Sequence, residues 1–447
     1  MSDESHTSLG DFPADWRVAR LADVATKIQD GTHFSPQSTS GPFLYLTSKN
    51  VRFGRMDIED CSWISEQEHR GIYSRCDVRY GDVLLTKDGA NTGNAALNSL
   101  KEQFSLLSSV AIIRTDDQSA HSPYVLQYIL SSQGQQRLKD MMAGNAITRL
   151  TLEKIKAFTL PLPPVRQQRK IARILTTLDN VITQTEALIA KYQAIKQGLM
   201  HDLFTRGVDA TGKLRPPQSE APELYKQSDL GWIPKEWERT TVDNVLICID
   251  AGKSPDCPDL PASSGEWGVL KVSAVQPDGF RSIENKVVQN PIWVNPNYEV
   301  HDGDLLISRC NTYQLVGLVC LVRSPQPRLM ICDKTLRLRV DPRRATVAFL
   351  FWLMQQAVVR RHIEIHATGT SGSMKNISQP SIRSAMVMLP PIAEQRQISS
   401  RIQAIEERIR SEQRTQDKLR TQKTGLMQDL LTGKVPVKAD EPEEVNP

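Results

Sequence analysis

The chain has 447 residues, which is long enough for two to four domains with a substantial buried core. Its 55 basic and 51 acidic residues give a net charge of +4, a weakly basic balance that neither requires nor excludes a nucleic-acid partner. Seven cysteines without a C-x-x-C pair argue against a disulfide framework or a zinc site, and the lack of a signal peptide or an 18-residue apolar run predicts a cytoplasmic protein without a membrane span.

Residues 1–164 are predicted to form a first mixed α/β domain. The apolar runs FLYLT, DVLLT and SVAIIR are typical of strands between Gly, Asn and Asp turns, and YVLQYILSS is typical of a short helix. Polar and basic side chains in the turns suit DNA, although turn propensity alone is the commoner reason for any single one of them. The DNA-binding candidates of this domain are Thr47, Lys49, Asn50, Arg52, Arg55, Lys87, Asn91, Thr92 and Asn94.

Residues 165–206 are predicted to form one long helix. Pro163-Pro164 precedes it and Gly207 follows it, which is the expected asymmetry of helix ends. Apolar positions recur at alternating steps of four and three residues, the spacing of a coiled-coil seam. The predicted inward positions are Ile171, Leu175, Leu178, Ile182, Thr185, Ile189, Tyr192, Lys196, Leu199 and Leu203.

Residues 207–233 are rich in proline, glycine and polar residues without periodicity, and are predicted to form a linker. Residues 234–391 are predicted to form a second mixed α/β domain, in which VAFLFWLM resembles the first domain's YVLQYIL helix. Its polar turns match those of the first domain. The DNA-binding candidates here are Lys271, Ser273, Arg309, Asn311, Tyr313, Lys375 and Asn376.

A second long helix is predicted over residues 392–434, and residues 435–447 are predicted to be a disordered tail. Several polar residues interrupt the seams of both helices, among them Thr185, Lys196 and Lys423. They are either frayed and solvated positions, or residues that set the helix register or meet another subunit. The inward positions of the second helix are Ile398, Ile402, Ile405, Ile409, Glu412, Gln416, Leu419, Lys423, Leu426 and Leu430.

The two halves of the chain are repeats. Ile171 and Ile398 are 227 residues apart, as are Met200 and Met427, so the helices align without an insertion. YGDVLLTKDGANTG and DGDLLISRCNTYQLVG align more loosely in the domains. A domain-helix-domain-helix repeat closes with approximate two-fold symmetry if the helices are antiparallel. The best-preserved apolar stretch supplies the subunit-interface candidates Leu199, Met200, Leu203, Leu426, Met427 and Leu430, although packing within the chain would also explain it.

The sequence contains no complete catalytic motif of the common classes, which predicts a non-catalytic chain. GVDATGKL, from Gly207, matches a phosphate-binding loop except that Leu214 replaces the required Ser or Thr and no helix can follow. His362 and His366 have metal-ligand spacing on a predicted helix but lack an obvious third ligand, so a surface pair is the simpler interpretation. We expect no metal site.

The long helices, which begin with Pro-Pro-x-x-x-Gln and end with GLMHDLFT and GLMQDLLT, resemble the specificity subunit of type I restriction-modification systems. The resemblance covers residues 12–435, and LPPIAEQRQI and GLMQDLLTGKV are its most specific motifs. One position departs from the family pattern, since Gln167 stands where the second copy has Glu394. The implied fold is α+β, with two mixed α/β target recognition domains separated by two long antiparallel coiled-coil helices in a pseudo-two-fold repeat.

The resemblance also implies a function. Each domain would recognise one half of a bipartite site in double-stranded DNA, and the helices would act as a spacer and dock two modification (methyltransferase) subunits. The complex would methylate adenine N6 and, with restriction (motor-nuclease) subunits, cleave unmodified DNA. S-adenosylmethionine, ATP and Mg2+ would bind the partner subunits and no cofactor this chain. The alternative interpretation of the sequence is a coiled-coil adaptor that does not bind DNA.

Overall fold

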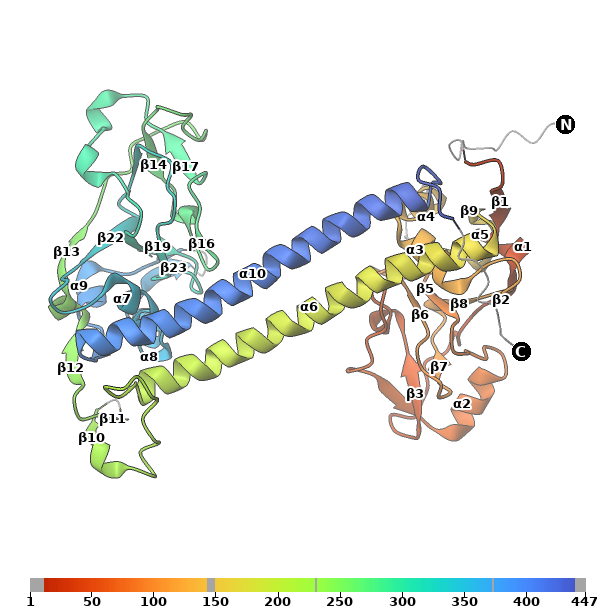
Figure 1. Ribbon diagram of the computed structural model, residues 1–447, viewed down its shortest axis with the longest axis horizontal. Coiled ribbons are helices and arrows are strands. Elements are labelled where there is room, and N and C mark those ends of the chain that lie inside the picture. The colour runs from red at the N-terminus through yellow and green to blue at the C-terminus, as the bar shows by residue number, and fades with distance from the viewer. Residues whose placement is uncertain (1–11, 143–148, 230, 372–373, 439–447) are drawn as a thin grey trace. The chain divides into compact units, whose positions relative to one another are not determined.

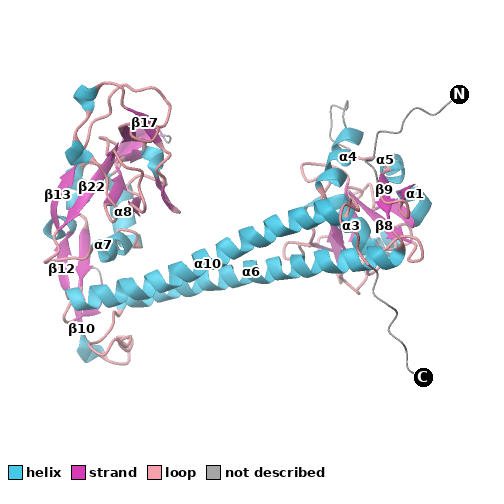
Figure 2. Ribbon diagram, turned by 45° about the horizontal axis from the view of Figure 1, so that its top comes forward, coloured by secondary structure: helices cyan, strands magenta, loops and turns pink. Residues whose placement is uncertain are grey.

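The computed structural model describes residues 12–142, 149–229, 231–371 and 374–438 (Figure 1). Two compact units divide the chain. The first combines the chain up to Ile189 with the chain from Glu412 onward, and the second is the continuous segment Ala190–Ser411. Both units mix helices with strands (Figure 2), which confirms the predicted α+β class. The predicted tail lies largely outside the described residues.

The strands of the first unit are β1 (Arg17–Arg20), β2 (Ala25–Asp30), β3 (Phe43–Leu46), β4 (Ser62–Ile64), β5 (Val83–Thr86), β6 (Ala95–Leu97), β7 (Ser105–Leu106), β8 (Val110–Thr115) and β9 (Thr159–Leu162). They form an antiparallel sheet in the order β2-β8-β5-β6, a smaller sheet β4-β3-β7 and the pair β1-β9. The runs FLYLT, DVLLT and SVAIIR correspond to β3, β5 and β8, so these three strand predictions are confirmed.

The strands of the second unit are β10 (Tyr225–Ser228), β11 (Gly231–Pro234), β12 (Glu238–Thr241), β13 (Leu246–Asp250), β14 (Gly268–Leu270), β15 (Val275–Gln276), β16 (Gly279–Phe280), β17 (Asn285–Val287), β18 (Leu305–Ser308), β19 (Cys310–Asn311), β20 (Val319–Leu321), β21 (Leu329–Met330), β22 (Thr335–Val340), β23 (Thr368–Ser371), β24 (Met374–Asn376) and β25 (Met386–Leu389). The order β13-β22-β18-β20 repeats β2-β8-β5-β6, β17-β14-β21 repeats β4-β3-β7, and β12-β25 repeats β1-β9. The pairs β3-β7 and β14-β21 are both parallel, so the duplication extends to strand direction.

Short helices complete each domain: α1 (Leu21–Val24), α2 (Glu66–Tyr73), α3 (Ser122–Leu130), α4 (Ser132–Met142), α5 (Leu152–Ala157), α7 (Val347–Leu353), α8 (Ala357–His366) and α9 (Gln379–Arg383). The predicted helices YVLQYIL and VAFLFWLM lie in α3 and α7. Matching caps begin α5 and α9, because the Thr151 hydroxyl accepts a hydrogen bond from the Lys154 amide and the Ser378 hydroxyl accepts one from the Ser381 amide.

The two long helices are α6 (Val165–Thr205) and α10 (Ile392–Leu430), both of which begin directly after the Pro-Pro pairs. The first ends one residue earlier than predicted, and the second ends four residues earlier. Gly207 and Gly433 follow the helix ends with φ angles of +62° and +73°, a conformation that favours glycine. Within the described residues, neither long helix nor any shorter one is apolar over a length that could cross a membrane.

The glutamine of the Pro-Pro-x-x-x-Gln motif ties each long helix to its domain. The Gln168 side-chain amide donates to the Pro163 carbonyl at 2.8 Å and to the Ser119 carbonyl at 3.2 Å, and its oxygen accepts from the His121 amide. The Gln395 side-chain amide likewise donates to the Pro390 and Arg344 carbonyls, and its oxygen accepts from the Thr346 amide. In each copy, one glutamine side chain therefore joins the start of the long helix to a loop of the domain. This loop precedes α3 in the first copy and α7 in the second.

Side chains between α6 and α10 pair in an antiparallel sense, as predicted. In the first unit, Lys423 Nζ lies 2.5 Å from Asp179 Oδ1 and Arg420 pairs with Glu186. In the second unit, Lys196 forms an ion pair with Glu406. All predicted inward positions of both helices are buried or half-buried. The cross-helix ion pairs of Lys196 and Lys423 favour the interpretation that polar seam residues set the helix register.

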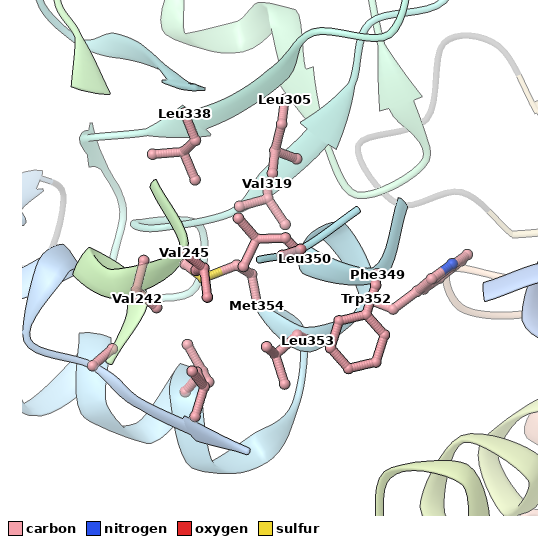
Figure 3. Close-up of a cluster of buried hydrophobic side chains, with 14 of the residues drawn as sticks. Val242, Val245, Leu305, Val319, Leu338, Phe349, Leu350, Trp352, Leu353 and Met354 are labelled. Atoms are coloured by element: carbon pink, nitrogen blue, oxygen red, sulfur yellow. The ribbon is translucent and has the colours of Figure 1, made fainter. Parts of the chain in front are cut away.

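The ends of the long helices belong to the domain cores. Figure 3 shows the second core, in which Val242, Leu305, Leu350 and Met354 meet between the sheet and α7. Leu203 of α6 and two isoleucines of α10 are buried in this same cluster. The first core likewise contains Ile171 and Leu175 of α6 and Leu430 of α10. Each domain is therefore built on helical segments that are distant in sequence.

The segment 207–233, which was predicted to be a linker, is folded onto the second unit. Strands β10 and β11 form a hairpin, and Ala221, Tyr225 and Ile233 are buried. The prediction of an unstructured linker is wrong because proline and glycine here build tight turns around a buried ion pair between Arg215 and Glu394.

Candidate nucleic-acid interface

The first group of candidates in the first domain lies on the turn that follows β3. Thr47 caps a short 3-10 helix, Ser48–Asn50, and Lys49 is exposed beside Asp60. Asn50 is only 2% exposed, and its amide donates to the carbonyls of Asp57 and Asp60. Asn50 therefore shapes this turn from inside and does not present its side chain to a ligand, contrary to the prediction.

Lys87, at the end of β5, is also internal. Its ammonium group lies 3.4 Å from Asp30 and 3.0 Å from Asp88, and the side chain is 2% exposed. The prediction that Lys87 contacts DNA is corrected on this ground, because its charge is neutralised within the domain. Asp88 in turn pairs at 2.9 Å with Arg149, a half-exposed cation that the sequence analysis did not single out.

Hydrogen bonds bring the two turns of the first domain together. Ser109 joins them, because its hydroxyl accepts from the Ser48 amide at 3.1 Å and its carbonyl accepts from the Lys87 amide at 2.9 Å. The Asn94 side-chain amide donates to the Val51 carbonyl. Exposed or half-buried candidates from both turns thus share one neighbourhood, which we call the first turn surface: Thr47, Lys49, Arg52, Arg55, Asn91, Thr92 and Asn94.

The second domain assembles its candidates through a strand pair. β19 pairs with β24 so that Cys310 faces Asn376 and Asn311 faces Lys375. The Arg309 carbonyl accepts from the Ile377 amide, and Tyr313 follows on an exposed turn. The predicted residues come from two segments that are distant in sequence, and the strand pair brings them together. We call this group the second turn surface: Arg309, Asn311, Tyr313, Lys375 and Asn376.

Ser273 lies on the short 3-10 helix Val272–Ala274, which matches Ser48–Asn50 in the first domain, and Lys271 directly precedes this helix. The Lys271 ammonium is 2.7 Å from Asp259, and the Ser273 hydroxyl donates to Glu284 at 2.5 Å. Both are half-buried, and carboxylates of their own domain already occupy their polar atoms. Their contact with DNA remains a prediction.

An ion pair that recurs in both domains, and that is not among the residues predicted from the sequence, supports both turn surfaces. Arg114 of β8 lies 2.8 Å from Asp82, and Arg337 of β22 lies 3.0 Å from Asp304. The two aspartates are those of the repeated Gly-Asp motif before β5 and β18. The hydrogen bond that Arg114 donates to the Asp82 carboxylate raises the pKa of Arg114, which favours its charged form. The repeated Gly-Asp motif was the signal in the sequence from which this ion pair could have been predicted. The ion pair holds in place the strands that end in the candidate turns.

The subunit-interface candidates pack within the chain. Leu203 and Leu430 are 0% and 4% exposed in the two domain cores. Leu199 and Met200 pack against the second core, and Leu426 and Met427 pack against the first. The prediction of a partner surface is therefore corrected for Leu203 and Leu430, which are buried in the domain cores. Leu199, Met200, Leu426 and Met427 are half-buried, and their contact with a partner remains a prediction.

The turn surfaces offer guanidinium, ammonium, amide and hydroxyl groups. Such groups bind phosphates and the edges of bases, with arginine matching guanine and asparagine matching adenine. The two turn surfaces lie on domains of the same topology but carry different residues. They are therefore suited to the recognition of two different DNA sequences.

Comparisons with known proteins agree with this geometry. Residues 13–197 match the family model of the type I restriction modification DNA specificity domain. The chain is 35% identical over 209 residues to the type I restriction enzyme EcoEI specificity subunit of Escherichia coli, which covers 45% of this chain and 34% of that protein. It is 24% identical to the MjaVIII specificity subunit of Methanocaldococcus jannaschii, over 95% of this chain and 94% of the relative.

A solved structure shows the same fold over nearly the whole chain. The S subunit of the type I restriction-modification system of M. genitalium superposes with a TM-score of 0.59 at 13% identity, covering 95% of this chain and 97% of its own. In its matching domain and along nearly its full length, the chain is therefore similar to type I restriction-modification specificity subunits, and it shares their duplicated fold.

Proposed function

We propose that this chain is the DNA sequence-recognition subunit of a type I restriction-modification complex and that each domain recognises one half of a bipartite site. The observation that carries this proposal is that one topology is built twice while the turns at matching strand ends carry different side chains. Asn91 and Thr92 follow β5, whereas Asn311 and Tyr313 follow β18. A constant scaffold with variable turns supports two independent base-recognition surfaces.

The proposed complex contains two modification subunits, which transfer a methyl group from S-adenosylmethionine to adenine N6. Restriction subunits that use ATP and Mg2+ cleave unmodified DNA. The proposed role of this chain is non-catalytic. The pseudo-symmetry of the repeat supports two copies of one partner, because equivalent surfaces occur twice on the chain.

Exchange of one domain tests the proposal. Strand β1 pairs with β9, so residues 12–164 should be exchanged as one block for the matching domain of a relative. We expect methylome sequencing of cells that carry the system to show a change in one half of the methylated motif. The control exchanges residues 234–391 and should change the other half. A motif that changes in both halves after either exchange would contradict separate recognition, and a wild-type complex that shifts no DNA in a gel would favour the adaptor interpretation.

A further inference from the structure

An exposed aromatic side chain lies at the tip of a tight turn in the first domain. Phe53 is 55% exposed, and Arg52 and Arg55 on either side of it are also exposed. Exposed large apolar side chains are common singly on protein surfaces, so exposure alone gives no function. The contacts around this turn distinguish Phe53 from other exposed apolar residues.

The backbone holds the turn rigidly. Val51 and Met56 form an antiparallel bridge, and the Arg52 amide donates to the Arg55 carbonyl at 2.9 Å. Gly54, with a φ of +84°, completes the turn, and its amide donates to the Ala95 carbonyl at 2.9 Å. A ring on such a turn loses little further conformational entropy when a partner binds it.

The turn adjoins the first turn surface. Its contact with Ala95 and the bond from Asn94 to Val51 place it against the turn that carries Asn91 and Thr92. The Arg52 guanidinium lies 3.2 Å from Asp57, whereas Arg55 forms no ion pair with any of the described residues. The tip therefore offers one apolar ring next to a cation that no carboxylate of the described residues neutralises.

We propose that Phe53 inserts between neighbouring base pairs of bound DNA and stacks on a base, while Arg55 binds the adjoining phosphate. This inference rests on the proposed function. A phenyl ring has no hydrogen-bonding group and cannot distinguish base edges, but it stacks on any base and opens a base step as an apolar wedge. Phe53 then contributes affinity and local distortion, and the polar residues of the first turn surface contribute the sequence choice.

The second domain supplies a matched control. Its equivalent turn joins β15 and β16, where Val275 pairs with Phe280, and carries Pro277 and Asp278 at the tip. Asp278 is paired with Arg281 at 2.8 Å, so this tip has neither an exposed aromatic ring nor a free cation. The distortion caused by the wedge should therefore occur only in the half-site that the first domain recognises.

The test uses the full chain in complex with its modification subunits and a duplex that contains the methylated motif. 2-Aminopurine replaces one base at a time along each half-site, since its fluorescence rises when a base is unstacked. We expect the wild-type complex to produce a rise at one step of the first half-site. Phe53→Ala should lose this rise and bind the duplex about tenfold more weakly, Phe53→Trp should retain both, and Pro277→Ala should change neither.

Two results would overturn the proposal. Phe53→Ala could retain the wild-type fluorescence profile and affinity, which would show that the ring does not enter the duplex. Alternatively, native mass spectrometry could show that Phe53→Ala loses a modification subunit, which would make Phe53 a protein contact. A wild-type complex that binds no DNA would instead reject the proposed function, and this inference with it. Equal midpoints of thermal unfolding for the wild type and Phe53→Ala would show that the variant folds.

Discussion

Single buried charges in this protein are neutralised by partners from distant parts of the chain. Glu394 of α10 accepts hydrogen bonds from Arg215 at 2.6 Å, from the Trp237 indole at 3.1 Å and from the Val208 amide at 2.8 Å. In the first copy, Gln167 takes this position, and its side-chain amide donates a hydrogen bond to the exposed Asp15. Gln167 is neutral and therefore needs no counter-ion.

We expect Glu394→Ala to lower the free energy of unfolding by about 3–5 kcal/mol, because it leaves the Arg215 guanidinium buried without a counter-ion. Urea unfolding followed by far-UV circular dichroism measures this loss. Gln167→Ala is the matched control and should cost less than about 1 kcal/mol. Equal losses for the two variants would show that the ion pair does not stabilise the second unit.

Asp77 makes the first domain sensitive to acid. Burial opposes ionisation of Asp77, but the hydrogen bond from Lys27 and the charge of Arg114 outweigh it and lower the pKa of Asp77 to about 2. A lowered pKa stabilises the folded state above the unfolded value near 4, and this contribution is lost as the pH falls from about 4 to 2.

Asp77→Asn should therefore lower the urea midpoint at pH 7 and flatten its decline between pH 4 and pH 2. Urea titrations at several pH values compare the two proteins. If both midpoints decline in parallel through that range, Asp77 is not the titrating group.

At the scale of secondary-structure elements, the pairing of α6 with α10 depends on matched charges. Lys196 and Lys423 are equivalent residues, and their partners Glu406 and Asp179 are also 227 residues apart. Each lysine therefore meets an acid of the other helix, as a pseudo-two-fold axis requires. The lysine in the second unit also lies over the Trp352 ring at 5.0 Å.

A double-mutant cycle tests the second-unit pair. Lys196→Glu should destabilise the protein because the new carboxylate faces Glu406. Adding Glu406→Lys should recover stability, and the coupling free energy between the two positions should be about 1–2 kcal/mol. The exposed pair Glu66 and Arg70, on α2, is the control and should show no more than about 0.5 kcal/mol. A coupling energy near zero for Lys196 and Glu406 would show that the seam lysines tolerate other registers.

At the scale of the whole molecule, the protein is one scaffold built twice. Each compact unit combines a domain with the start of one long helix and the end of the other. The duplicated strand orders and the repeated glutamine anchors of Gln168 and Gln395 keep the helices and domains in fixed relation within each unit. Changes of helix length should therefore be transmitted to the domains and not absorbed by loose joints.

Deletion of one heptad from both helices tests this transmission. The antiparallel register pairs Asp179 with Lys423, so removal of residues 179–185 together with residues 417–423 keeps the remaining seam in register. About 10 Å of helix is lost. We expect methylome sequencing to show a shorter gap between the two half-sites, or no methylation if the partners no longer fit. An unchanged gap would show that helix length does not set the spacing.

The sequence by itself determined the long helices, the duplication, the inward seam positions and the principal strands. These features follow from local rules, namely apolar periodicity, proline before a helix and glycine after it. The same rules failed at residues 207–233, because composition cannot show that Glu394, far along the chain, would bury Arg215. Stabilisation by a distant partner leaves no local pattern.

Only the tertiary structure decided which polar candidates are accessible. Lys87 and Asn50 are of the same residue types as candidates that are accessible at the surface. Carboxylates and carbonyls of their own domain nevertheless bind their side chains. Asn311 and Lys375 are far apart in sequence and meet because β19 pairs with β24. Burial and strand pairing depend on contacts between distant segments, and a turn motif read residue by residue contains no information about such contacts.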